Sequence, residues 1–279
     1  MASTLKVTLC QMASSANKQA CIDKAVSLVK SAAARGSRLV VLPECFNSPY
    51  SCKRFEEFSE ALSPGHPTFD ALSAITRDCR VWLVAGSIPE RKEGKVYNSS
   101  MVFGPDGTLR GVHRKVHLFK IHTEQLCVDE SEVLSAGGTA EAITMEDVNL
   151  KIGVAICFDM RFPQLAHRLA SQGTSIIVCP AAFNMVTGPL HWELTARARA
   201  MDNQQFVMMC SQARDEAADY VAYGHSLIAD PLGRVVGQLD EKEGALDVDL
   251  DLGLIDDARA RIPILKGIRH DLYSLQWGL

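Results

Sequence analysis

The chain has 279 residues, of which 47% are hydrophobic and 22% charged, and its net charge is −4. This composition is typical of a globular protein with a large core, and a pI near 6.1 indicates no basic surface for nucleic acid or membranes. No apolar run approaches the ~18 residues that a membrane span needs. We therefore expect a protein that acts on small molecules.

The nine cysteines form no C-x-x-C pair, which is typical of reduced thiols in a cytoplasmic protein. The first residues, 1–11, lack a charged segment followed by a long apolar one, so we expect a strand there and not a signal peptide. The sequence is also compatible with a mitochondrial location for part of the protein.

In the first half of the chain, apolar strands alternate with amphipathic helices. We expect strands over 5–9, 38–42 and 81–87, a helix over 17–35, and a helix within 59–79 that follows the turn at 63–67. The pattern then changes to a hairpin, with strands over 97–103 and 108–113 around the turn Gly104–Gly107. A polar loop is expected over 120–134.

The second half repeats this pattern. Strands are expected over 140–146 and 152–157, then a helix (164–171), a strand (175–179) that ends at Pro180, a helix (191–202), a strand (206–211), a hairpin (224–229 and 234–239) and a last strand (244–248). The repeat predicts a pseudo-twofold α/β architecture in which two sheets pack face to face with helices outside. We expect one domain over 1–279, with a C-terminal tail over 252–279 that packs on the body or on a partner subunit.

Cys157 lies where an apolar strand ends, and Pro163 follows near the first turn of a helix. A thiol at such a turn lies near backbone N–H groups with a partial positive charge, which favours thiolate and offers a site for an oxyanion. Cys157 is therefore the candidate nucleophile. The alternative is that Cys157 is a small buried hydrophobe, as free cysteines often are.

Glu44 and Lys115 also follow strands directly, where sites assemble in α/β proteins. Together with Cys157 they supply the groups that acyl transfer from an amide needs. Glu44 as general base would take the thiol proton, and the Lys115 ammonium with the backbone N–H of Phe158 would hold the tetrahedral oxyanion. Taken alone, Glu44 could equally be a helix-capping or solvated carboxylate.

Four separated motifs carry a resemblance to a known family: Leu-Pro-Glu44-Cys-Phe, Arg-Lys115-Val-His-Leu-Phe, Glu130-Ser, and Cys157-Phe-Asp-Met-Arg-Phe-Pro163. The chain resembles the nitrilase (carbon–nitrogen hydrolase) superfamily over essentially its whole length, and most closely the omega-amidases within it. The resemblance implies a four-layer α-β-β-α sandwich and a triad of Glu44, Lys115 and Cys157 supported by Glu130. It also implies a homodimer or a higher homo-oligomer, and neither a cofactor nor a metal.

The resemblance further implies hydrolysis of the terminal amide of 2-oxoglutaramate or 2-oxosuccinamate, through a thioester on the cysteine. These substrates carry a carboxylate, for which the guanidinium of Arg161 offers two parallel N–H donors. Further substrate contacts are expected from Tyr50, Phe158, Phe183 and Thr187. For His191 and Trp192, core packing and substrate contact are equally compatible with the sequence.

Several alternatives remain at this stage. A Cys-His hydrolase lacks a motif that pairs a histidine with Cys157, and a zinc site at His113, His117 and His122 lacks the H-E-x-x-H pattern. Within the family, an amidase of deaminated glutathione or an N-carbamoyl amide hydrolase is the second candidate, and a true nitrilase fits the motifs less well. A non-catalytic binding protein on the same fold is the alternative of another class.

Overall fold

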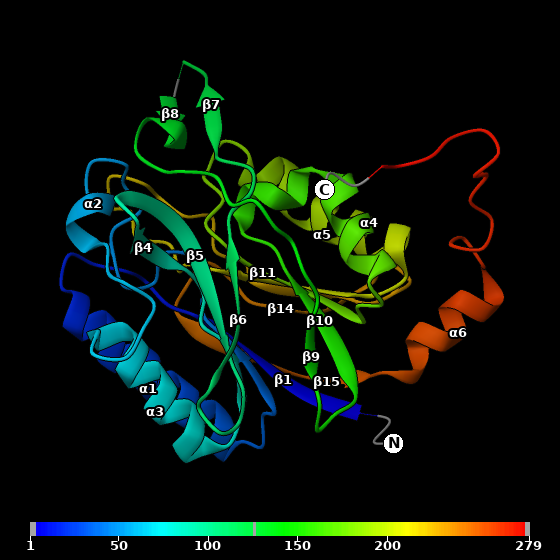
Figure 1. Cartoon of the computed structure of the whole chain (residues 1–279), viewed down its shortest axis with the longest axis horizontal. Helices are drawn as coiled ribbons and strands as arrows, with labels where there is room; N and C mark the ends of the chain where they lie inside the picture. Colours follow the sequence, from blue (N-terminus) through cyan, green and yellow to red (C-terminus); the bar gives the residue numbers. More distant parts are fainter. Residues whose placement is uncertain (1–3, 125–126, 277–279) are drawn as a thin grey trace.

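The computed structural model describes residues 4–124 and 127–276, and its strands form two large sheets between helices (Figure 1). The strands of the first sheet are β1 (Thr4–Gln11), β2 (Leu39–Val41), β3 (Trp82–Val84), β4 (Ile88–Lys92), β5 (Lys95–Phe103), β6 (Leu109–Arg114) and β15 (Gly244–Asp251). They are ordered β15-β1-β2-β3-β5-β4, and β6 also pairs with β5. The first sheet therefore contains the first half of the chain and one strand from its end.

The second sheet is built from the second half of the chain. Its strands are β9 (Ile143–Met145), β10 (Leu150–Val154), β11 (Ile176–Ala181), β12 (Phe206–Ser211), β13 (Leu227–Ala229) and β14 (Val235–Gln238). They are ordered β14-β13-β12-β11-β10-β9.

The two sheets repeat one arrangement. Strands β1, β2 and β3 are parallel to one another, as are β10, β11 and β12. An antiparallel strand flanks each set on its first side, β15 beside β1 and β9 beside β10. Antiparallel strands also follow the third parallel strand of each sheet, β5 beside β3 and β13 beside β12. The predicted internal repeat is thus present in the strand order.

The inner faces of the two sheets form one apolar core. Because successive side chains of a strand point to opposite faces, Leu5, Val7 and Leu9 of β1 all point inward. They share a cluster with Val178 of β11 and Met208 of β12 from the other sheet. The predicted face-to-face packing of the sheets is therefore observed.

Helices cover both outer faces, as Figure 1 shows. Helices α1 (Lys18–Ala34) and α3 (Pro67–Cys79) pack on the first sheet, and α4 (Pro163–Ser171) and α5 (Gly188–Asn203) pack on the second. The side chain of Asn17 caps α1 by accepting the Ala20 N–H at 3.1 Å. Four layers result, in the order helix, sheet, sheet, helix.

The helix predicted within 59–79, after the turn at 63–67, is α3: it begins at the end of that turn, at Pro67, and ends at Cys79 as predicted, so only residues 59–66 were wrongly included. Proline suits the first helical turn, where its missing N–H would have no partner. Residues 59–66 are not helical, and the short helix α2 (Phe55–Phe58) precedes them. After α2, the Glu60 N–H donates a hydrogen bond to Pro89 O at 3.2 Å. Strand β4, to which Pro89 belongs, was not predicted.

The prediction that Pro180 ends its strand was also wrong, since β11 continues to Ala181. Val178 O points toward β10 and accepts the Ala155 N–H at 3.0 Å. Pro180 is two residues after Val178, so its backbone nitrogen points toward the same side. On that side β10 has already ended at Val154. The missing N–H of Pro180 therefore removes no hydrogen bond between strands.

The polar loop over 120–134 contains more structure than expected, although Gln125 and Leu126 lie outside the described residues. Strands β7 (Lys120–His122) and β8 (Cys127–Asp129) form a small ribbon, and a 3₁₀ turn η1 (Glu130–Glu132) follows. The predicted tail begins with a helix, α6 (Gly253–Arg261), and its last residues, 277–279, lie outside the described residues. In the part of the chain that the structure describes, no helix is long and apolar enough to cross a membrane.

Candidate active site

Side chains from four separate segments meet at the carboxyl ends of the strands. Glu44 follows β2, Lys115 follows β6, Glu130 begins η1, and Cys157 begins a 3₁₀ turn, η2 (Cys157–Arg161), that follows β10. Glu44, Lys115 and Glu130 have no exposed surface, and Cys157 is 5% exposed. The four predicted catalytic residues thus lie in the interior of the molecule.

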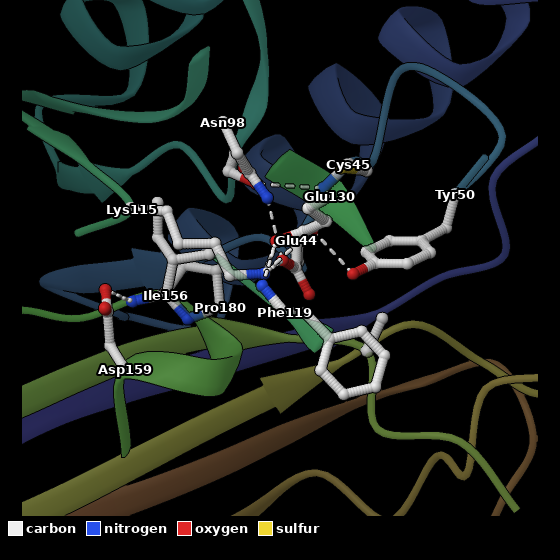
Figure 2. A network of polar contacts seen from close by, with 12 residues as sticks. Glu44, Cys45, Tyr50, Asn98, Lys115, Phe119, Glu130, Ile156, Asp159 and Pro180 are labelled. Carbon is white, nitrogen blue, oxygen red and sulfur yellow. Dashed lines mark hydrogen bonds and ion pairs between the residues drawn. The ribbon is translucent and has the colours of Figure 1, made fainter. Parts of the chain in front are cut away.

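Lys115 lies between the two carboxylates, as Figure 2 shows. Its Nζ is 3.0 Å from Glu44 Oε1 and 2.9 Å from Glu130 Oε2. Burial alone lowers the pKa of an ammonium, but here the negative charges of Glu130 and Glu44 outweigh burial and raise the pKa of Lys115. Lys115 is therefore a fixed positive charge.

The backbone of Lys115 is held on both sides. Its N–H donates to Asn98 O at 2.8 Å, and its carbonyl oxygen accepts the Gly137 N–H at 2.9 Å. These bonds fix the segment that follows β6, and with it the direction in which the long side chain leaves the backbone.

Glu44 has one engaged and one free oxygen. Oε1 accepts from Asn98 Nδ2 at 2.8 Å and from Lys115 Nζ at 3.0 Å. Oε2 has no hydrogen-bond partner among the described residues. Burial raises the pKa of Glu44, Lys115 lowers it and Glu130 raises it, with a net upward shift. A carboxylate with a raised pKa and a free oxygen is suited to accept and return a proton.

Cys157 is in the left-handed backbone region with φ +46°, which is rare for a residue other than glycine. Such strain is typical of a side chain that is held in a sharp turn for function. Burial raises the pKa of Cys157 well above its usual value, and the charge of Glu44 raises it further, against an opposing effect of Lys115. The expectation that the turn favours a resting thiolate was therefore wrong. Burial and the charge of Glu44 thus disfavour a resting thiolate, so the thiol needs a base during attack.

Asp159 ties the nucleophile turn to the lysine segment. Its Oδ2 accepts the Ile156 N–H at 3.0 Å and lies 2.9 Å from His113 Nε2. Its Oδ1 accepts the His117 N–H at 2.9 Å and lies 2.8 Å from His117 Nδ1. Burial raises the pKa of Asp159, but the bonds to both histidines outweigh burial, so the net shift is strongly downward. One carboxylate thus connects residues on both sides of Lys115 with the turn that carries Cys157.

Glu130 accepts hydrogen bonds at both oxygens. Oε1 takes the Tyr50 hydroxyl at 2.7 Å, and Oε2 takes the Phe119 N–H at 2.6 Å. With Lys115 Nζ, every contact of this carboxylate is to a donor, which is what a buried ionised group requires. These contacts hold Glu130 beside Lys115.

A small pocket opens onto Cys157. Four residues predicted to contact substrate or to flank the nucleophile line it, namely Phe158, Arg161, Phe183 and Thr187. Tyr50 does not line it, since its hydroxyl is bonded to Glu130 and its ring packs on Tyr220 with 4.4 Å between centroids. Other lining residues were not predicted: Phe119, Ala182, Asn184 and Tyr220.

Arg161 brings an uncompensated positive charge to this pocket. Its guanidinium is half-buried, and burial lowers its pKa. Among the residues that the structure describes, no carboxylate lies within 4.0 Å of it. A partly desolvated cation without a counter-ion favours binding of an anion.

The chain was compared with known proteins. The family model described as carbon-nitrogen hydrolase matches residues 6–260. The omega-amidase NIT2 of Xenopus tropicalis is 46% identical over 272 residues, with 97% of each chain covered, and that of Homo sapiens is 42% identical, with 98% of each chain covered. The crystal structure of Saccharomyces cerevisiae Nit3, a member of branch 10 of the nitrilase superfamily, superposes with a TM-score of 0.87 at 42% identity, covering 95% of this chain and 96% of that one. The chain belongs to the carbon-nitrogen hydrolase family, and its fold is that of the nitrilase superfamily.

Proposed function

We propose that this protein is an omega-amidase, a hydrolase of carbon–nitrogen bonds other than peptide bonds in linear amides. Its substrates would be short 2-oxo acids with a terminal amide, 2-oxoglutaramate and 2-oxosuccinamate, and its products the 2-oxo dicarboxylate and ammonia. One observation carries the substrate class: Arg161, a cation without an acidic partner among the described residues, lines the same pocket as Cys157. Relatives that bear the name omega-amidase support the same activity.

Acylation begins when the thiol of Cys157 attacks the amide carbon. Glu44 accepts the thiol proton as the sulfur–carbon bond forms, because the raised pKa of Cys157 leaves little thiolate beforehand. The carbonyl oxygen becomes an oxyanion, for which Lys115 Nζ and the Phe158 N–H supply positive charge. The N–H of Phe158 lies in the first turn of η2, where N–H groups have no acceptor within the helix.

Collapse of the tetrahedral intermediate breaks the carbon–nitrogen bond. Glu44 returns its proton to the leaving nitrogen, ammonia departs, and a thioester on Cys157 remains. A water molecule then attacks the thioester carbon while Glu44 takes the water proton. When this second intermediate collapses, the proton returns to the sulfur, which frees the carboxylic acid and restores the enzyme.

The size of the pocket supports a short substrate. The small pocket at Cys157 admits a four- or five-carbon acid more readily than a tripeptide derivative such as deaminated glutathione. The distal carboxylate of the substrate would accept two parallel N–H bonds from Arg161, and the ring of Phe183 would pack against the carbon chain.

The test is ammonia release by the purified protein from 2-oxosuccinamate, a deaminated-glutathione analogue and an N-carbamoyl amine. We expect release chiefly from 2-oxosuccinamate, and none from the Cys157→Ser variant. Preference for another panel member would overturn the substrate class and leave the catalytic residues standing. Equal release by Cys157→Ser would overturn the mechanism, and no release from any amide would favour a non-catalytic binding protein.

We also propose a homodimer or higher homo-oligomer, located in the cytoplasm. Large apolar side chains on the outer face of α5 support an oligomer, since Leu190 is 67% and Leu194 65% exposed. Light scattering on the purified protein should give at least twice the monomer mass, and Leu194→Glu should reduce it. A monomer at micromolar concentration would refute this part of the proposal.

A further inference from the structure

We propose that His191 is a positioning residue for the substrate carboxylate. In its neutral form it would hold the guanidinium of Arg161 so that the remaining N–H groups face the substrate. This inference rests on the omega-amidase function proposed above and adds a residue to the recognition of the substrate anion.

The contact joins two elements that are distant in the sequence. Arg161 ends η2, and His191 lies in the first turn of α5, where its N–H donates to Thr187 O at 2.9 Å. Arg161 Nη1 is 3.0 Å from His191 Nδ1. A guanidinium has donors only, so Nδ1 is the acceptor, and the neutral imidazole carries its proton on Nε2.

The other contacts of the guanidinium are less directional. Its central carbon lies 4.9 Å from the ring centroid of Phe183 and 5.8 Å from that of Phe158. Aromatic faces attract the cation but do not choose which N–H edge points into the pocket. Within the described part of the chain, the bond to His191 is the only hydrogen bond of the Arg161 side chain. The hydrogen bond to His191 therefore sets the orientation of the Arg161 guanidinium.

The expected consequence is a selective effect on anionic substrates. A fixed guanidinium has lost its side-chain freedom before the substrate arrives, so less order must be imposed on binding. Without His191 the arginine would reach other rotamers and the solvent. The carbon–nitrogen bond that is cleaved lies at the other end of the substrate from the carboxylate. KM for the anionic substrate should therefore change much more than kcat.

The experiment compares five single variants and one double variant on two amides, 2-oxosuccinamate and butyramide, which lacks a carboxylate. For His191→Ala we expect KM for 2-oxosuccinamate to rise about tenfold or more, since a hydrogen bond to a charged group is lost. We expect kcat to stay within about twofold and butyramide hydrolysis to be unchanged. Glu193→Ala, on the exposed side of the same helix, is the matched control and should behave like the wild type.

Two further substitutions separate the hydrogen bond from the shape of the side chain. In His191→Asn the amide oxygen can take the place of Nδ1, and KM should return toward the wild-type value. In His191→Gln the oxygen reaches the place of Nε2, and KM should stay raised. This pair decides the question even if the alanine variant folds poorly. Equal KM values for Asn and Gln would contradict the proposal.

The double variant Arg161→Ala/His191→Ala tests whether His191 acts through Arg161. We expect its KM to equal that of Arg161→Ala alone, because His191 then has nothing to position. Additive effects, or equal losses on butyramide, would show a merely structural role and overturn the inference. If the wild type itself fails to prefer 2-oxosuccinamate over butyramide, the proposed function fails, and this inference fails with it.

Discussion

The Glu130→Gln substitution would test whether the second carboxylate supports the lysine. Glutamine has almost the same shape but accepts at one oxygen only. Its oxygen would face the Phe119 N–H, which can only donate, and its NH₂ would face the Tyr50 hydroxyl, which can rotate to accept. Both carboxylate oxygens of Glu130 lie within 3.0 Å of Lys115 Nζ, so the new NH₂ meets another donor there.

The structure sets the expected size of the effect. One charge-assisted hydrogen bond is lost, and Lys115 keeps a single carboxylate partner, Glu44. We expect the free energy of unfolding to fall by about 2–4 kcal/mol. The displaced ammonium should lower kcat by about 10²-fold, as loss of an oxyanion donor does. Denaturant unfolding and ammonia release from 2-oxosuccinamate measure the two effects, with Glu132→Gln on the exposed side of η1 as the control.

The pH profile of the same variant supplies a second test. Activity requires ionised Glu44, so kcat/KM falls as the pH drops through the raised pKa of this group. The negative charge of Glu130 contributes to that upward shift. Removing it should move the acidic limb of the profile to lower pH. If the acidic limb stays at the same pH or moves to higher pH, and stability and kcat equal those of the wild type, the supporting role of Glu130 is refuted.

Three further substitutions have defined outcomes. Glu44→Gln still accepts from Asn98 but is no base, so kcat/KM for ammonia release should fall by about 10²–10⁴-fold. The melting temperature should also fall, as in Glu130→Gln, because the buried Lys115 again keeps a single carboxylate partner. Asp159→Asn should lower the free energy of unfolding at pH 7 by about 1–3 kcal/mol. Because folding depresses the pKa of this carboxyl, that difference should be full above ~pH 4 and shrink as the pH falls further, as urea titrations would show. Gly137→Ala would place its Cβ 2.2 Å from Arg114 O, so it should destabilise the protein by about 1–3 kcal/mol and lower kcat, whereas Gly138→Ala, with open space around it, should do neither.

The sequence predicted the layers because periodicity reports burial directly. Long apolar strands such as β12 were placed with their observed bounds, since a strand buried on both faces is a continuous apolar run. The start of α3 and the end of β11 were misjudged because each depends on a tertiary contact. The bond from Glu60 to Pro89, and the point where β10 stops beside Pro180, have no local signature.

The candidate site divides in the same way. The nucleophile, base and lysine were predicted because each lies just past a predicted strand, and the motifs around them resemble a known family. Asn98, which holds both Glu44 and the Lys115 backbone, was missed, because it stands in a polar run with two serines in β5 and nothing local sets it apart. The upward shift of the pKa of Cys157 was not predictable, since it depends on burial and on the charge of Glu44, which only the folded chain brings near.

The proposed catalytic residues come from both halves of the repeat, and this explains why the candidate site lies where the sheets meet. Glu44 and Lys115 belong to the first half, and Cys157 belongs to the second. Gln212, just after β12, crosses between them, and its Nε2 donates to Glu44 O at 2.7 Å and to Cys45 O at 3.3 Å. Neither sheet alone places a base beside the thiol. The shared core between the sheets therefore sets the geometry of the chemistry as well as the stability of the fold.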